Sequence, residues 1–212
     1  MYKTVVFDLD GTLLNTLTDL ADAGNRLCRK YGWPTHERQA YRYFVGNGIP
    51  KLVERLAPAD QRTPAVLEAA LADFKRDYGQ HLRDTTAPYP GIPEMLAKLK
   101  ANGVQLAVFS NKADALAKEV VKDYFGTQYF TIVRGQMTGV APKPAAEGTN
   151  ALLQALHADP ASTLYVGDSN VDVETAHNAN LPCCGAVWGF RTREELNAAG
   201  AEYLAENSDE LY

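Results

Sequence analysis

The stretch Thr4-Val5-Val6-Phe7-Asp8-Leu9-Asp10-Gly11-Thr12 decides how the rest of the chain is interpreted. It starts with β-branched and aromatic residues and changes abruptly to acid, glycine and threonine. Such a change is typical of a buried parallel strand that ends in a loop. In open α/β sheets, ligands bind in the loops at the carboxyl ends of the strands. The stretch therefore predicts a strand over residues 4–7 and a candidate binding loop directly after it.

Helical periodicity governs the next seventy or so residues. Apolar residues recur at spacings of three and four, as on one face of a helix. The expected helices cover residues 17–31, 36–44, 49–57 and 64–83. Because no convincing strand pattern interrupts them, we expect a helical insert over residues 16–85. The remaining segments, 1–15 and 86–212, would form an α/β core.

After the insert, strand and helix patterns alternate. The expected strands cover residues 104–109, 130–133, 163–166, 183–188 and 201–204. The expected helices cover residues 93–101, 113–125, 145–158, 170–179 and 194–199. Alternation of this kind implies a mostly parallel sheet with right-handed crossovers. The predicted fold is a three-layer, Rossmann-like α/β core with a helical domain inserted after the first strand.

Composition excludes several functional classes. The 212 residues include 26 acidic and 21 basic side chains, a net charge of -5, which disfavours binding to nucleic acid. No apolar run approaches the roughly 20 residues of a membrane helix, and acid appears too early for a signal peptide. The three cysteines, Cys28, Cys183 and Cys184, form no CxxC pair and are expected to pack as small apolar residues. We expect a soluble, cytoplasmic protein, a monomer or homodimer, with no nucleic-acid or membrane partner.

Polar residues follow three of the predicted strands, and a lysine lies between two prolines. The groups are Asp8/Asp10/Thr12, Ser110/Asn111, Asp168/Asp172 and Lys143. Clustered carboxylates repel one another unless a positive charge lies between them. Aspartate oxygens suit a hard cation, most plausibly Mg²⁺, whereas zinc is disfavoured because these motifs contain no His or Cys. The sequence therefore predicts a magnesium site.

Such a site could also hold a dianionic phosphoryl group. Lys143 would supply a second positive charge, and the Ser110 hydroxyl and the backbone N–H groups near Asn111 and Gly11 could donate to phosphoryl oxygens. One carboxylate would be free to attack phosphorus and form an aspartyl-phosphate. A second carboxylate, two residues further on, could protonate the leaving oxygen and later activate water.

The complete motif set resembles that of the haloacid dehalogenase superfamily. Its four parts are Phe7-Asp8-Leu9-Asp10-Gly11-Thr12-Leu13, Ser110-Asn111-Lys112, Lys143-Pro144 and Gly167-Asp168-Ser169-Asn170-Val171-Asp172. The resemblance extends over essentially the whole chain, helical insert included. It implies that residues 16–85 form a four-helix cap domain over a catalytic core of residues 1–15 and 86–212. Dehalogenase members lack an aspartate at the Asp10 position, so its presence implies a phosphoryl-transfer member.

The resemblance also implies roles for individual residues. Asp8 would be the nucleophile and Asp10 the general acid/base, with Lys143 offsetting the charge of Asp8. Mg²⁺ would be held by the carboxylates of Asp8 and Asp168 and the backbone carbonyl of Asp10, with Asp172 supporting this shell. The phosphoryl-binding set would comprise Gly11, Thr12, Ser110, Asn111 and Lys143, in which Thr12 stabilises the motif loop.

Further segments look like the phosphoglycolate phosphatase-like subfamily. They are Asp19-Leu20-Ala21, Val45-Gly46-Asn47-Gly48, Leu52-Val53, Tyr89-Pro90-Gly91 and Trp188-Gly189-Phe190. The resemblance implies a Mg²⁺-dependent phosphatase of a small phosphorylated metabolite, phosphoglycolate being the first candidate. Asn15 and Ala145-Ala146 depart from the subfamily pattern and loosen that choice of substrate. A sugar-phosphate mutase resembling β-phosphoglucomutase, a pyrophosphatase or nucleotide phosphatase, and a non-catalytic binding module remain alternatives.

Overall fold

The computed structural model describes residues 2–211. Its main sheet has six parallel strands in the order β5-β4-β1-β6-β7-β8. The strands are β1 (Thr4–Phe7), β4 (Gln105–Ala113), β5 (Phe130–Gln136), β6 (Thr163–Gly167), β7 (Cys183–Ala186) and β8 (Tyr203–Ala205). The parallel α/β fold predicted from the sequence is thereby confirmed.

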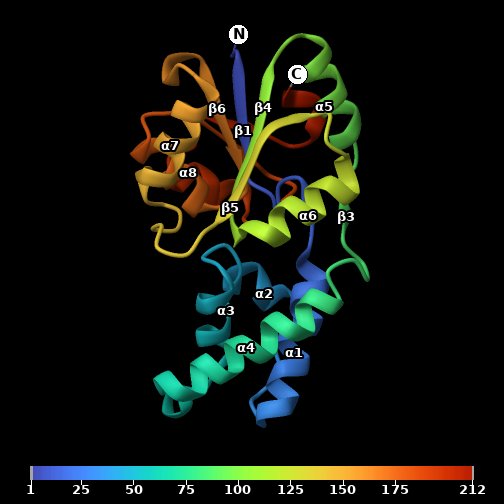
Figure 1. The fold of residues 1–212 in the computed structure, drawn as a ribbon, viewed down its shortest axis with the longest axis vertical. Coiled ribbons are helices and arrows are strands. Elements are labelled where there is room, and N and C mark those ends of the chain that lie inside the picture. The colour runs from blue at the N-terminus through green and yellow to red at the C-terminus, as the bar shows by residue number, and fades with distance from the viewer. Residues whose placement is uncertain (1, 212) are drawn as a thin grey trace. The chain divides into compact units, whose positions relative to one another are not determined.

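Helices cover both faces of this sheet (Figure 1). They are α5 (Ile92–Ala101), α6 (Asp114–Phe125), α7 (Ala146–Leu156), α8 (Asn170–Asn178) and α9 (Arg193–Ala198), with 3₁₀ turns at Pro160–Ser162 and Ser208–Leu211. Figure 1 shows α5 and α6 on one face of the sheet, and α7 and α8 on the other. The chain runs from β1 outward through β4 to β5, then returns to β6 on the opposite side of β1. The carboxyl end of β1 is therefore the topological switch point, where ligands bind in such sheets.

The centre of the sheet is apolar on both faces. All four residues of β1 are buried, as expected for a strand covered by helices on both sides. Leu152, Leu153 and Leu156 of α7 and Val173 of α8 belong to one buried cluster that packs on this sheet. The three cysteines are free thiols and buried. Burial raises the pKa of all three thiols, in keeping with their predicted packing role.

Strand ends differ most from the sequence-based expectation. Strand β4 continues four residues beyond the predicted end at Phe109, so Ser110-Asn111-Lys112 lie in the strand rather than after it. The β4–β5 ladder is irregular between Phe109 and Ala113 and resumes where Ala113 pairs with Gln136. An irregular ladder tolerates polar side chains. The polar side chains of residues 110–112 made this segment resemble a loop in the sequence.

Contacts divide the chain into two compact units: residues 1–15 with 88–212, and residues 16–87. The second unit, called here the helical unit, has four α-helices and one 3₁₀ turn within the described residues. These are α1 (Leu17–Tyr31), α2 (Arg38–Phe44), α3 (Ile49–Leu56), the turn Ala59–Gln61 and α4 (Pro64–Gln80). No helix in residues 2–211 combines the length and the apolar character needed to cross a bilayer.

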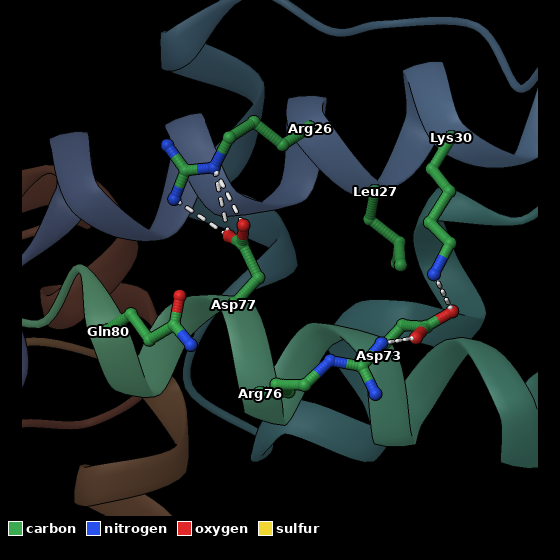
Figure 2. Close-up of a pocket in the computed structure, with 7 residues that line it drawn as sticks. All are labelled: Arg26, Leu27, Lys30, Asp73, Arg76, Asp77 and Gln80. Atoms are coloured by element: carbon green, nitrogen blue, oxygen red, sulfur yellow. Dashed lines mark hydrogen bonds and ion pairs between the residues drawn. The ribbon is translucent and has the colours of Figure 1, made fainter.

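Ion pairs between α1 and α4 line a pocket of the helical unit (Figure 2). Arg26 pairs with Asp77 at 2.7 Å, and Lys30 pairs with Asp73 at 2.6 Å. Arg76 also pairs with Asp73. The side chains of Arg26 and Asp77 are 33% and 34% exposed, so water screens their attraction.

Asp19 joins the two ends of the helical unit. This buried carboxylate, in the first turn of α1, accepts hydrogen bonds from the backbone N–H and the hydroxyl of both Thr85 and Thr86, at 2.5 to 2.9 Å. Four donors satisfy the lone pairs of a buried carboxylate. At the same boundary, β2 (Leu14–Asn15) pairs with β3 (Ala87–Pro88) in a separate two-stranded sheet.

Candidate active site

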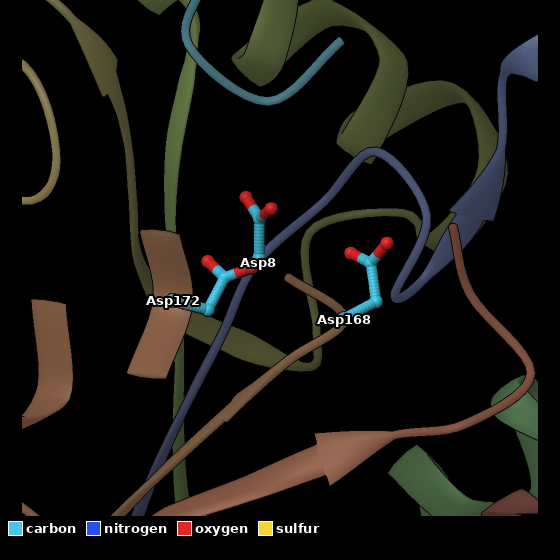
Figure 3. Close-up of side chains that lie close together, drawn as sticks. All are labelled: Asp8, Asp168 and Asp172. Carbon is cyan, nitrogen blue, oxygen red and sulfur yellow. The ribbon is translucent and has the colours of Figure 1, made fainter. Parts of the chain in front are cut away.

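Three buried carboxylates gather at the switch point of the main sheet. Asp8 follows β1, while Asp168 and Asp172 follow β6. Because Phe7 pairs with Val166 in register, these strands end at the same level, and the Asp8 N–H donates to the Val166 carbonyl at 2.9 Å. An oxygen from each carboxylate lies within 4.8 Å of the other two. Figure 3 shows the three carboxyl groups pointing to the same side of the strand ends.

Lys143 joins two of these carboxylates. Its Nζ lies 2.9 Å from Asp8 Oδ1 and 2.7 Å from Asp172 Oδ1. It also donates to the hydroxyl of Tyr165 at 3.1 Å and to the Phe109 carbonyl at 3.3 Å. The lysine side chain is 1% exposed. A buried charge is tolerated only when it is paired and hydrogen-bonded, and here both conditions are met.

Hydrogen bonds distinguish Asp168 from Asp172. Asp172 accepts from Lys143 and, at 3.5 Å, from Tyr165 on one oxygen, and from the N–H and hydroxyl of Ser169 on the other. Asp168 accepts one bond on each oxygen, from the Thr12 hydroxyl at 2.9 Å and the Phe190 N–H at 2.8 Å. A carboxylate has about four lone-pair positions. Asp168 therefore keeps capacity for a further ligand, whereas Asp172 is saturated and acts as a support.

Two glycines let the backbone approach Asp168. Gly11 has φ of 94°, in the region that favours glycine, and a Cβ there would lie 2.3 Å from Asp168 Oδ2. A Cβ on Gly189 would lie 2.2 Å from the Asp168 Cβ. Any larger residue at either position would push Asp168 aside.

The local charges perturb the proton affinities of the cluster. Burial raises the pKa of Asp8 to about 7. The charge of Lys143 lowers this pKa, but the charge of Asp172 raises it and so opposes Lys143. Burial, with the charges of Asp172 and Asp8, also holds the pKa of Asp168 well above its usual range. Burial alone would lower the pKa of Lys143, but the Asp172 and Asp8 carboxylates outweigh that effect and raise it. The site thus holds more negative charge than its lysine neutralises.

This imbalance fits a metal ion. Asp8, Asp10, Asp168 and Asp172 contribute four formal negative charges, while Lys143 and a second lysine, Lys112, contribute two positive ones. The excess of two negative charges equals in size the charge of one divalent cation. The donor set is all oxygen, and Asp168 has lone pairs to offer. The residues present therefore fit a hard divalent cation.

The predicted phosphoryl-binding residues are engaged in different ways. Ser110 Oγ is buried and accepts from the Lys112 N–H at 3.2 Å, which leaves its own proton to donate. The Asn111 side chain bonds both the N–H and the carbonyl of Lys143, and so secures that lysine's segment. The Gly11 N–H donates to the Leu14 carbonyl at 2.8 Å, so this particular backbone donor is used within the loop. Thr12 contacts Asp168.

Three groups that contact the side chains of this site were not predicted from the sequence. Lys112 Nζ lies 3.0 Å from Asp10 Oδ1, although both side chains are distant in sequence. Tyr165 contacts Lys143 from inside β6, where an aromatic residue signals only packing. The Phe190 N–H is a backbone group that no side-chain pattern could reveal. Lys112 did leave a signal, because it directly follows the Ser110-Asn111 pair.

The helical unit contains three basic residues near its Gly46-Asn47-Gly48 segment, namely Arg42, Lys51 and Arg55. Lys51 pairs with Glu54 at 2.8 Å on the surface of α3. Arg55 donates to the Phe44 carbonyl and to Asn47 Oδ1, both at 2.8 Å. Arg55 therefore holds the Gly46-Asn47-Gly48 loop in place.

Fold and site together define a parallel α/β protein with a metal-competent carboxylate–lysine cluster at its switch point. Residues 5–186 match the family of haloacid dehalogenase-like hydrolases, and the chain belongs to that family. It is 31% identical to the phosphoglycolate phosphatase of Thiobacillus denitrificans over 191 residues, 89% of this chain and 84% of that one. It is also 31% identical to the phosphoglycolate phosphatase of Chromobacterium violaceum, over 99% of this chain and 95% of that one.

A solved structure with a similar fold also comes from a protein with this assignment. The crystal structure of a provisionally assigned phosphoglycolate phosphatase from Lactobacillus delbrueckii subsp. bulgaricus superposes with a TM-score of 0.93. That protein is 28% identical, and the match covers 99% of this chain and 96% of that chain. The family resemblance seen in the four sequence motifs is confirmed.

Proposed function

We propose that this protein is a Mg²⁺-dependent phosphatase that hydrolyses small phosphomonoesters through an aspartyl-phosphate on Asp8. The supporting observation is the position of Asp8, buried at the switch point, 2.9 Å from Lys143 and beside Asp168. The relatives named phosphoglycolate phosphatase make phosphoglycolate the first substrate to test.

In the first half-reaction, an Asp8 oxygen attacks phosphorus. The bond between Asp8 and phosphorus forms as the bond to the leaving oxygen breaks, and Asp10 delivers a proton to that oxygen. Lys143 and the Ser110 hydroxyl hold the phosphoryl oxygens during transfer. Asn111 keeps the Lys143 segment in place through its two backbone hydrogen bonds.

In the second half-reaction, water attacks the phosphorus of the aspartyl-phosphate. Asp10 accepts the water proton, the Asp8–phosphorus bond breaks, and inorganic phosphate leaves. Asp8 and Asp168, with the Asp10 backbone carbonyl, would hold Mg²⁺, and Asp172 would support them. When bound, the ion neutralises charge on the phosphoryl oxygens and on the carboxylates.

We also propose that the helical unit, residues 16–87, serves as the family's cap. Closing such a unit over an active site excludes water and adds contacts to the substrate. Arg55 supports this role because it fixes the loop around Asn47, where glycine residues allow an unusual backbone path.

The test is phosphate release from a panel of phosphomonoesters, assayed with Mg²⁺ and with EDTA. The panel contains phosphoglycolate, sugar phosphates, nucleotides and pyrophosphate. We expect Mg²⁺-dependent release, and complete inactivity toward every compound would refute the proposal. An isomerised sugar phosphate formed without free phosphate would instead identify a mutase.

A further inference from the structure

Lys112 is a buried cation that the reaction as proposed above does not use. Its side chain is 2% exposed, and its Nζ lies 3.0 Å and 3.2 Å from the two carboxylate oxygens of Asp10. The Asp10 side chain is 15% exposed, so this ion pair lies at the inner wall of the site. Lysine is almost never fully buried unless it is paired, because leaving water costs an ammonium group several kcal/mol.

The backbone on both sides of this pair is fixed. The Lys112 N–H donates to Ser110 Oγ, which places the lysine beside the proposed phosphoryl-binding hydroxyl. On the other side, the Leu9 carbonyl accepts from the N–H groups of Thr12, Leu13 and Leu14, which closes the loop that contains Asp10. With both backbones held, the contact with two oxygens restricts the Asp10 carboxyl group to one orientation.

The other cation of the site cannot do this. Lys143 is engaged by Asp8, Asp172, Tyr165 and the Phe109 carbonyl. The two lysines therefore have separate partners: Lys143 serves the carboxylates next to phosphorus, and Lys112 serves the carboxyl group that handles protons.

We propose that Lys112 is a positioning residue that holds the Asp10 carboxyl group in line for proton transfer to the leaving oxygen. This inference rests on the proposed function. Lys112 acts through its ion pair with the Asp10 carboxyl group. Misplacing a catalytic group by as little as 1 Å can cost about a hundredfold in rate.

The test compares two substrates that differ in their need for the proton. An alkyl phosphomonoester has a poor leaving group and needs Asp10, whereas p-nitrophenyl phosphate releases a stable phenolate and does not. For Lys112→Met, we expect kcat/KM to fall at least tenfold with the alkyl ester and to stay within about twofold with the aryl ester. Since kcat/KM reports events up to phosphoenzyme formation, a slower second step leaves the aryl value unchanged and produces a burst of p-nitrophenol.

Two further variants separate positioning from folding. Asp10→Asn should lose more kcat/KM with the alkyl ester than with the aryl ester, and the double variant with Lys112→Met should lose no more than Asp10→Asn alone. The double variant also removes both partners of the buried pair, so it leaves no orphan charge to unfold the protein. Lys112→Arg, which keeps the cation, should recover part of the alkyl activity.

The outcomes are distinguishable. Equal losses on both substrates for Lys112→Met, or additive losses in the double variant, would overturn the positioning role. A wild-type protein without Mg²⁺-dependent activity on either ester would refute the proposed function itself.

Discussion

The same residue types form two ion clusters in this chain, one buried in the α/β unit and one exposed in the helical unit. Lys143 and Asp172 are each 1% exposed in their side chains, while Arg26 and Asp77 are about one-third exposed. Water solvates the second pair in any state of the chain, so forming it changes little. The buried cluster must be compensated by its own contacts, and buried clusters of this kind are concentrated at functional sites.

The largest predicted effect comes from the nucleophile. Asp8→Asn should reduce turnover by roughly four or more orders of magnitude, because an amide cannot form the aspartyl-phosphate. Asp73→Asn makes the same chemical change in the exposed cluster and should leave turnover within about twofold. Phosphate release under saturating Mg²⁺ measures both. Turnover surviving in Asp8→Asn would assign the nucleophile elsewhere.

Stability gives the next contrast. Lys143→Met leaves Asp8 and Asp172 without their shared cation, which should cost about 3–5 kcal/mol of unfolding free energy in the metal-free protein. Lys30→Met removes the exposed partner of Asp73, a carboxylate that still pairs with Arg76, and should cost less than about 1 kcal/mol. Urea titrations in EDTA measure both values. Similar costs for the two variants would mean that burial does not separate the clusters.

The pH dependence of stability should also differ between the clusters. Burial raises the pKa of Asp8 to about 7 in the fold, against 3.8 as its ordinary value. An acid with a raised folded pKa binds more protons when folded, so its contribution to stability is full below about pH 4 and is lost as pH rises toward 7. Each unit of difference corresponds to about 1.4 kcal/mol.

The measurement is the unfolding free energy of wild type minus that of Asp8→Asn, in EDTA at pH 5 and pH 8. We expect this difference to fall with rising pH and Mg²⁺ to reduce the fall, because a bound cation stabilises the ionised carboxylate. The matched difference for Asp73→Asn should not fall, because hydrogen bonds from Lys30 and Tyr31 lower the pKa of Asp73. A difference independent of pH at Asp8 would contradict the raised pKa.

The smallest predicted effect on stability is that of the partly exposed ion pair between Arg26 and Asp77. A double-mutant cycle on Arg26→Met and Asp77→Asn should give a coupling energy of about 0.2–1 kcal/mol that decreases with added salt. The equivalent cycle on Lys143→Met and Asp172→Asn should give a coupling several times larger and insensitive to salt. Equal salt dependence would show that water reaches the buried cluster.

Much of this comparison could be predicted from sequence. The change from Phe7 to Asp8 located β1 and its carboxyl end, and alternating patterns gave the parallel sheet, because both depend on local periodicity. The placement of Asp8 beside Asp168 followed from topology, since neighbouring parallel strands end at one edge. The same logic could not reveal the Lys112–Asp10 pair or the Tyr165 contact, which depend on the direction of single side chains.

The ends of strands and the hydrogen bonds of backbone N–H groups could not be predicted from the sequence either. Ser110 and Asn111 were expected in a loop because strand propensity disfavours polar residues, yet tertiary pairing with β5 extends β4 through them. Backbone N–H groups near Gly11 were expected to face a ligand, and the sequence could not show that the Gly11 N–H itself bonds the Leu14 carbonyl. Backbone hydrogen bonds leave no trace in residue identity.

The four hydrogen bonds that Asp19 accepts from Thr85 and Thr86, called here the Asp19 clasp, have a consequence for how the chain can change over evolutionary time. These hydrogen bonds bring the start and the end of the helical unit, residues 16–87, to one point. The entropy of closing a loop grows only slowly with its length, so helices can be lengthened, lost or exchanged beyond the clasp at little cost to β1 and β4. Asp19 thus closes the helical unit at its base, so a change in the length of these helices need not move the points where the chain enters and leaves the unit.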